Sequence, residues 1–240
     1  MRTSANLDLM LSLLLALFSL ASAVAVPNPG VIRQRLENRY RHANTLKAAF
    51  FERYSDGSGD VQSESGTVFF SRPGRMRWEY ESPEPKLFLV DGKNVWFYVP
   101  ADHTASHAKL KESSDWRTPI ALLAGKADLS QLCRKLEVVT RGPGSGADAD
   151  DVPLSPNDDV LRCIPRGESA EVASKQAIFL EVDPDGYLSR VVIHDPGDVT
   201  TEFRFGNWQE NIPIAETKFH FQTPPGVSIV DEESLAGEVH

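Results

Sequence analysis

The histidines of this chain are the first place to look for chemistry. His103 and His107 are four residues apart, a spacing that on a helix would let both imidazoles bind one metal ion. Their segment has no helical periodicity and supplies no third ligand, so we interpret them as solvated loop histidines. His194 precedes Asp195, which resembles part of a catalytic triad, but no Ser stands in a nucleophile-elbow motif. These residues predict neither a metal site nor a triad.

The other reactive residues are two cysteines and scattered carboxylates. Cys133 and Cys163 are the only cysteines, and they do not form the CxxC motif of thiol exchange. In an oxidising compartment the pair predicts one disulfide across a loop of about 30 residues, with two separate buried thiols as the alternative. Nothing supports a glycosidase-like pair of carboxylates, a phosphate loop or a nucleotide fingerprint. We therefore expect a protein that is not an enzyme and uses no cofactor.

The N-terminal segment is typical of a secretory signal peptide, which we place at residues 1–25. Arg2 gives a basic start, an apolar run extends from Leu9 to Leu20, and Ala21-Ser22-Ala23 offers small residues for cleavage. The run is shorter than the roughly 20 residues of a membrane-spanning helix. No cysteine near the cleavage site would carry a lipid anchor, so residues 26–240 are expected to form one soluble, exported domain. The net charge of −9 argues against nucleic acid and against unaided adsorption to anionic membranes.

Two helices are expected among the elements that would position a site. The first begins at the N-cap Asn28 and at Pro29, and its residues Ile32, Leu36 and Tyr40 recur at helical spacing. One face of this helix is therefore expected to pack against a core or at the mouth of a cavity.

The second helix is short and very apolar. Thr118 can cap it, Pro119 suits its first turn, and Gly125 ends it. A helix of this kind between strands tends to cover a sheet. Its residues include Ile120, Ala121, Leu122 and Leu123.

The rest of the chain is dominated by a period of two, which predicts strands. From Arg75 to Glu81 apolar and charged residues alternate without a break, so one face of that strand should be buried and the other exposed to solvent. Short antiparallel strands in sequence order favour an up-and-down sheet that curls towards a barrel. Residues 141–159 are rich in Gly, Pro, Ser and Asp and predict a flexible acidic loop, which the disulfide would hold at its base. The further expected strands are Lys47–Tyr54, Leu87–Val90, Val95–Val99, Ile178–Val182, Leu188–Ile193, Thr201–Phe205 and Lys218–Phe221.

Large aromatic residues are unusually frequent on these strands. They fit an ordinary packed core, and they equally fit the lining of a cavity; the pattern alone leaves both open. The residues are Phe50, Phe51, Phe69, Phe70, Trp78, Phe88, Trp96, Phe97, Phe203, Phe205, Phe219 and Phe221.

Five segments carry a resemblance to a known family. Ser71–Tyr80 contains an Arg-Pro pair that leads into a Trp-containing strand, and Val90–Tyr98 contains the sequence Asp-Gly-Lys-Asn-Val-Trp-Phe-Tyr. Thr118–Leu123, Phe203–Phe205 and Phe219–Val227 follow in the matching order and spacing. On these motifs the chain resembles the periplasmic outer-membrane lipoprotein carrier family (LolA) over nearly all of residues 26–240.

The resemblance implies a mainly β fold: an incomplete antiparallel β-barrel whose hydrophobic cavity is covered by the N-terminal helix and the short internal lid helix. It implies that Arg72 latches the lid through the carbonyls near Ile120–Ala124, since a guanidinium offers several fixed donors; the alternative is a surface arginine at a strand end. Met76 stands where some members carry an aromatic residue implicated in handover. The cavity lining implied by the resemblance is Ile32, Leu36, Phe50, Met76, Trp78, Tyr80, Trp96 and Tyr98.

The function implied by the resemblance is lipoprotein transport in the periplasm of a Gram-negative bacterium. As a chaperone and carrier, the protein would take acylated lipoproteins from an inner-membrane ABC transporter and deliver them to an outer-membrane receptor, as a monomer. The alternative is a lipid- or lipoprotein-binding periplasmic sensor of the same fold. The receptor itself is a further possibility, but it would need an N-terminal lipid, and a hydrolase is the remaining enzyme option.

Overall fold

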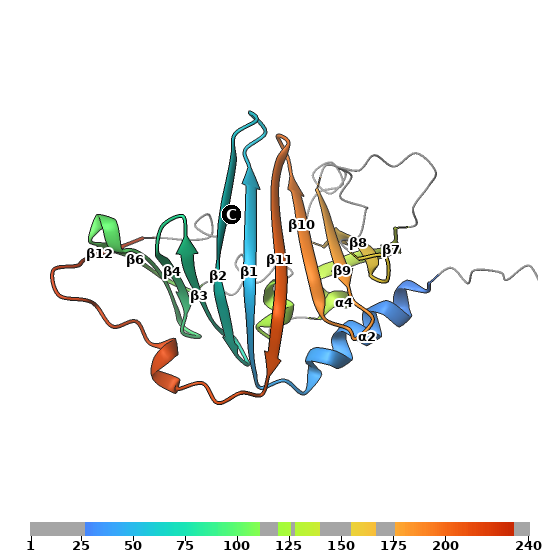
Figure 1. The fold of residues 1–240 in the computed structure, drawn as a ribbon, viewed down its shortest axis with the longest axis horizontal. Coiled ribbons are helices and arrows are strands. Elements are labelled where there is room, and N and C mark those ends of the chain that lie inside the picture. Colours follow the sequence, from blue (N-terminus) through green and yellow to red (C-terminus); the bar gives the residue numbers. More distant parts are fainter. Residues whose placement is uncertain (1–26, 111–119, 126–127, 140–154, 167–175, 233–240) are drawn as a thin grey trace, which may run out of the picture.

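A single open sheet forms the body of the protein. The computed structural model describes residues 27–110, 120–125, 128–139, 155–166 and 176–232. The sheet has 12 strands in the order β12-β6-β5-β4-β3-β2-β1-β11-β10-β9-β8-β7, so β12 and β7 form its two edges and it does not close into a barrel (Figure 1). The predicted mainly β half-barrel is thereby confirmed. No helix of the described ranges is long and apolar enough to cross a membrane.

All neighbouring strands pair antiparallel except β12 and β6, which are parallel. The longest strands, β1, β2 and β11, stand at the centre of the sheet (Figure 1). The strands are β1 (Thr45–Ser55), β2 (Val61–Ser71), β3 (Arg75–Ser82), β4 (Lys86–Val90), β5 (Asn94–Val99), β6 (Thr104–Lys109), β7 (Cys133–Val138), β8 (Asp159–Pro165), β9 (Ala177–Val182), β10 (Leu188–Asp195), β11 (Val199–Glu210) and β12 (Ser228–Asp231).

The two faces of the sheet carry separate apolar clusters. On β3 the residues Met76, Trp78 and Tyr80 are buried while the residues between them are partly exposed, as the alternation predicts. We call the face that holds Trp78 the inner face, and it carries the main core. The opposite, outer face carries a smaller cluster around Phe69 and Leu89.

The N-terminal helix α2 (Pro29–Arg41) forms as predicted. The Asn28 side chain accepts a hydrogen bond from the amide of Gly30 (2.8 Å), which caps the helix. Ile32, Leu36 and Tyr40 are buried. The helix packs against β7 and β8, and its Tyr40 hydroxyl accepts a hydrogen bond from the amide of Leu188 at the start of β10 (3.0 Å).

The second predicted helix is present as α3 (Ile120–Leu123), which ends at Gly125 with a φ of +71°. Its predicted cap, Thr118 and Pro119, lies outside the described residues. A further helix, α4 (Leu129–Leu132), was not expected from the sequence; Asp128 caps it by accepting a hydrogen bond from the amide of Gln131 (2.9 Å).

Cys133 and Cys163 form the expected disulfide, which joins the start of β7 to β8. The predicted loop at 141–159 needs a correction at its end, because Asp159 already belongs to β8, where it accepts a hydrogen bond from Arg35 (2.6 Å). Residues 141–154 of that loop, like the predicted signal peptide, lie outside the described residues.

The prediction of a strand at Lys218–Phe221 is wrong. Residues Glu216–Phe219 form the 3-10 helix η3, and the last strand is β12. Phe219 is buried against Phe69 and Leu89, and Phe221 packs on the same outer-face cluster. An apolar residue at every second position fits a strand, but here it lets an irregular segment place two aromatic rings on the sheet.

Candidate functional site: an apolar inner face under a helical cover

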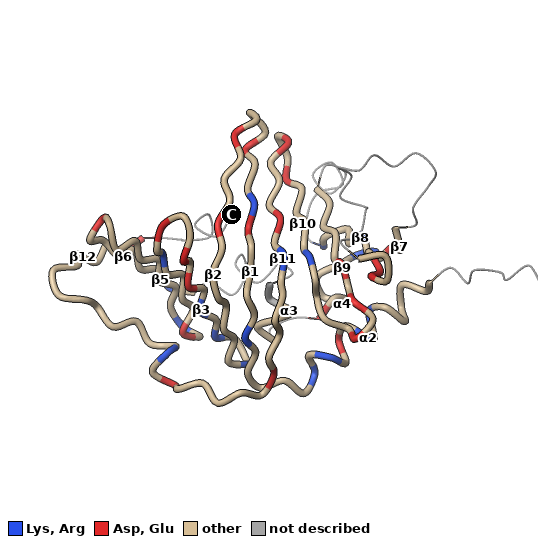
Figure 2. The backbone as a smooth tube through the Cα atoms, in the orientation of Figure 1, with Lys and Arg blue, Asp and Glu red and all other residues tan. Residues whose placement is uncertain are grey.

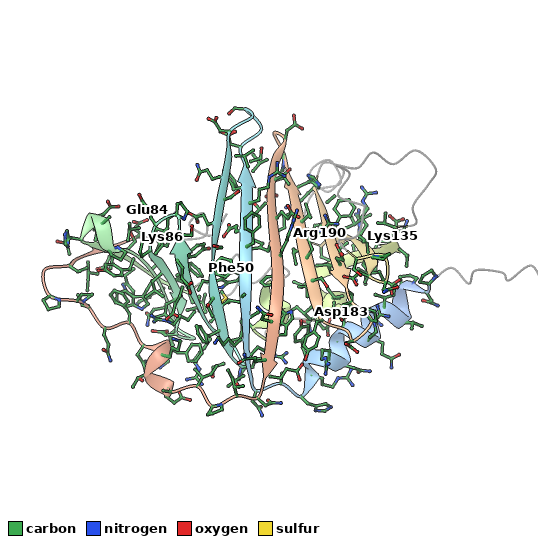
Figure 3. All side chains as sticks on the ribbon, viewed as in Figure 1. Phe50, Glu84, Lys86, Lys135, Asp183 and Arg190 are labelled. Carbon is green, nitrogen blue, oxygen red and sulfur yellow. A yellow bond between two sulfur atoms is a disulfide. The ribbon has the colours of Figure 1, made fainter. Side chains whose placement is uncertain are left out.

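Aromatic rings line the centre of the inner face. Trp78 on β3 is fully buried, and its ring centroid lies 4.8 Å from that of Phe50 on β1 and 5.5 Å from that of Phe203 on β11. Phe50 lies about midway along the central strand (Figure 3). The central strands of the sheet therefore contribute to one continuous apolar wall, which also includes Met76 and Tyr80.

Two helices cover this wall. Ile32 and Leu36 from α2 and Leu122 and Leu123 from α3 are each at most 3% exposed, and all four belong to the same cluster as Trp78. In Figure 1, α4 lies behind the sheet and α2 runs at the lower right, below β10 and β9. The wall is thus closed by short elements rather than by a second sheet.

Arg72, which follows β2, ties the cover to the sheet. Its Nη1 donates hydrogen bonds to the carbonyl oxygens of Tyr40 and Ala43 (the latter at 3.3 Å), at the C-terminal end of α2. The predicted partners were the carbonyls near Ile120–Ala124, and this part of the prediction is wrong. The arginine side chain reaches the end of α2, about 30 residues earlier in the chain, and the linear order of the residues does not reveal this contact.

Arg72 still touches the segment that ends α3, in a different way. A Cβ atom on Gly125 would come within 2.4 Å of Arg72 Nε, so the guanidinium lies flat against this glycine. Close by, the amide of Gly74 donates to the carbonyl of Ala124 (2.8 Å). Burial lowers the pKa of Arg72 below its ordinary value. The turn between β2 and β3 therefore contacts both covering helices at once.

Trp96 and Tyr98 are not part of the wall. The Trp96 ring stacks on Phe221 with 4.7 Å between centroids, and Tyr98 meets Phe221 edge-on at 5.8 Å, both on the outer face. Their assignment to the cavity lining is wrong, because β5 is apolar on both faces and alternation does not say which face is inner. Phe97, between them, packs against the main core instead.

A buried carboxyl group interrupts the apolar wall. Glu52 on β1 is 3% exposed, and its Oε2 accepts a hydrogen bond from the Tyr80 hydroxyl (2.9 Å). Burial is the main reason why the pKa of Glu52 rises from 4.5 to about 8. Sequence reasoning missed this residue, although it continues the inward positions Leu46, Ala48 and Phe50. That continuation is the signal that would have found it.

The acidic residues of the central hairpins gather elsewhere. Asp56 and Asp60 follow β1, and Asp195 and Asp198 lie around the β10–β11 turn. Figure 2 shows acidic residues at the tips of these hairpins, at the end of the sheet away from α2. The negative net charge thus does not concentrate on the apolar wall.

An open half-barrel with an apolar inner face beneath two short helices is the class of protein that these features define. The family model described as "Outer membrane lipoprotein carrier protein LolA" matches residues 41–222. The chain therefore belongs to the outer membrane lipoprotein carrier family LolA.

Relatives cover most of the chain. An outer-membrane lipoprotein carrier protein of Nitrosospira multiformis is 28% identical and aligns with 85% of this chain and 88% of its own length. The protein of that name from Erwinia tasmaniensis is 30% identical over 91% of this chain and 95% of its own. The one from Pseudomonas aeruginosa is 28% identical over 92% and 98%.

Proposed function

We propose that this protein is a periplasmic carrier that shields the acyl chains of lipoproteins on its inner face. On this proposal residues 1–25 direct export and are removed. The carrier then accepts lipoproteins that an inner-membrane ABC transporter releases, and it hands them to an outer-membrane receptor. Membership in the LolA family and the names of the relatives support this proposal.

The observation that carries the proposal is an aromatic wall closed only by short helices. An acyl chain of about 15 carbons gains on the order of 12 kcal/mol by leaving water, at about 0.8 kcal/mol per CH₂. A lipoprotein therefore needs a shield to cross an aqueous compartment. The inner face supplies apolar area for this once α2 and α3 move aside, since Phe50, Trp78 and Phe203 already form a continuous surface.

Release requires that the closed, empty state compete with the cargo. The cost of opening the cover is subtracted from the affinity for the acyl chains. The hydrogen bonds from Arg72 to Tyr40 and Ala43 supply part of that cost. We therefore assign Arg72 the role of a latch that acts on α2, while α3 is held through Gly125 and Ala124.

The edges of the sheet suit a protein that acts as a monomer. Exposed strand edges invite pairing with other chains unless they are short or charged. The edge strand β12 has four residues, and β7 carries the ion pair of Lys135 and Glu137 (2.5 Å).

A release assay tests the carrier function. The mature protein is incubated with spheroplasts that are making lipoproteins, and the soluble fraction is examined for one-to-one complexes. We expect release, and we expect none from spheroplasts depleted of the lipoprotein-releasing transporter. An unrelated exported protein of similar size and charge is the control. If the folded protein releases no lipoprotein, the carrier proposal is wrong and the sensor alternative takes its place.

A further inference from the structure

The inner face changes from apolar to polar at one level of the sheet. Along β1, the inward residues are apolar as far as Phe50, and Glu52 comes next. On β3 the same order leads from Trp78 to Tyr80. Glu52 is in register with Glu64 on β2, and Tyr80 is in register with Lys86 on β4. The polar residues that mark this level are Glu52, Glu64, Tyr80, Lys86 and, one step further along β11, Thr201.

Glu52 is energetically unfavourable in an ordinary hydrophobic core. Burying a carboxyl group costs free energy unless a cation or several donors compensate it. Lys86, the nearest candidate, forms its ion pair with Glu64. No lysine or arginine within the described ranges lies within ion-pair distance of Glu52, which has Tyr80 as its hydrogen-bond partner. An apolar residue in this place would pack against Phe50 without that cost.

At neutral pH this level of the wall offers hydrogen-bond donors. Because the pKa of Glu52 is about 8, its carboxyl group is protonated and has an O–H to donate while Oε2 accepts from Tyr80. The indole Nε1 of Trp78 is also buried, and it has no hydrogen-bond partner in the described part of the chain. Buried donors without acceptors are uncommon in folded proteins, and a bound acceptor is one group that would complete such a donor.

We propose that Glu52, Tyr80 and the Trp78 indole form a polar anchor for the carbonyl oxygens that link acyl chains to the cargo. This inference rests on the proposed carrier function. Ester and amide carbonyls are strong acceptors, and each would lie unpaired if it entered a purely apolar wall. With the carbonyls at the level of Glu52, the hydrocarbon tails extend along the apolar positions towards α2 and α3.

The anchor gives the carrier a preference for acyl over alkyl chains. The probe pair is a diacylglyceryl-cysteine peptide with ester-linked chains and its ether-linked twin, which has chains of equal length but no chain carbonyls. We expect the native protein to bind the ester probe about tenfold more tightly at pH 7, the equivalent of one or two hydrogen bonds. The preference should decline as the pH rises from 7 to 9, because the Glu52 carboxylate has no proton to donate.

Variants separate the anchor from a merely structural role. Glu52→Leu should bring the ester-to-ether ratio close to one without weakening ether binding, whereas Glu52→Gln, whose amide still donates, should keep the ratio and lose its pH dependence. Glu81→Leu, an exposed position on β3, is the matched control and should behave like the native protein. If Glu52→Leu fails to fold, Trp78→Phe removes one donor, keeps an aromatic ring at this position and should reduce the ratio.

The outcomes distinguish the two proposals. Equal binding of the ester and ether probes by the native protein would overturn the anchor and leave the carrier function intact. Binding of neither probe by the folded protein would overturn the carrier function itself. A ratio that survives in Glu52→Leu or, where that variant does not fold, in Trp78→Phe would also overturn the anchor.

Discussion

Our proposals assign different roles to two side chains near the inner face. Arg72 holds the cover from outside the aromatic cluster, through carbonyls at the end of α2. Glu52 lies within the wall, bonded to Tyr80. We expect Arg72 to affect how readily the site opens, and Glu52 to affect the protonation state of the site.

Replacing Arg72 tests the latch. Arg72→Leu removes charge-assisted hydrogen bonds, worth about 1.5–3 kcal/mol each. The cover should then open more easily, so cargo should bind more tightly and pass more slowly from the carrier to outer membranes that bear the receptor. Arg75→Leu is the control, because Arg75 pairs with Ser71 and Glu216 away from α2. Native transfer rates in Arg72→Leu would contradict the latch.

Glu52 should make the stability of the protein depend on pH. Its pKa is 4.5 when unperturbed and about 8 in the folded protein, so between these values the folded state holds a proton that the unfolded state has released. The free energy of unfolding should therefore fall as the pH rises from about 4.5 to 8 and level off above that range. In Glu52→Gln this fall should disappear. Urea unfolding at pH 5, 6.5 and 8 measures the difference, and parallel curves for both proteins would refute the assignment.

At the scale of elements, the bulge between β2 and β3 depends on one glycine. The register shifts between Ser65 and Gly66, and a Cβ atom at Gly66 would lie 1.9 Å from the carbonyl oxygen of Glu79. The two strands approach so closely there that no other residue fits without moving the backbone. This bulge bends the sheet next to Tyr80, which is in register with Gly66.

Gly66→Ala should therefore destabilise the protein by about 2 kcal/mol or more. Gly206→Ala on β11 is the matched control, since its Cβ would meet no atom within 4 Å, and it should change stability by no more than about 0.5 kcal/mol. Thermal unfolding of both variants provides the measurement. Equal melting temperatures would show that the strands can separate without cost.

At the scale of the whole molecule, an open sheet leaves each edge strand paired with a neighbour on one side only. The disulfide joins β7, the edge strand, to β8 across 30 residues of chain. Such a loop contributes roughly 3–4 kcal/mol by restricting the unfolded chain. The Cys133→Ser/Cys163→Ser variant should thus unfold at clearly lower urea concentration. Treatment of the native protein with reductant should reproduce the shift, and a variant with native stability would argue against this role.

Local patterns predicted much of the fold. The Asn28 cap, the alternation from Arg75 to Glu81 and the hairpin around Asp91-Gly92 each depend on residues close in sequence, so their backbone structure follows from local geometry and burial. The pairing of Cys133 with Cys163 followed from there being no other cysteine. The family and its half-barrel could likewise be predicted, because the order and spacing of the motifs can be read from the sequence without knowledge of tertiary contacts.

Only the tertiary structure decided which face of each strand is inner and which groups meet across the chain. A period of two defines two faces without naming them, so Trp96 and Tyr98 were assigned to the wrong one. The acceptors of Arg72 come from a helix far away in sequence. The raised pKa of Glu52 likewise depends on how completely its neighbours exclude water. Contacts and burial of this kind are properties of the packed molecule, and no short stretch of residues encodes them.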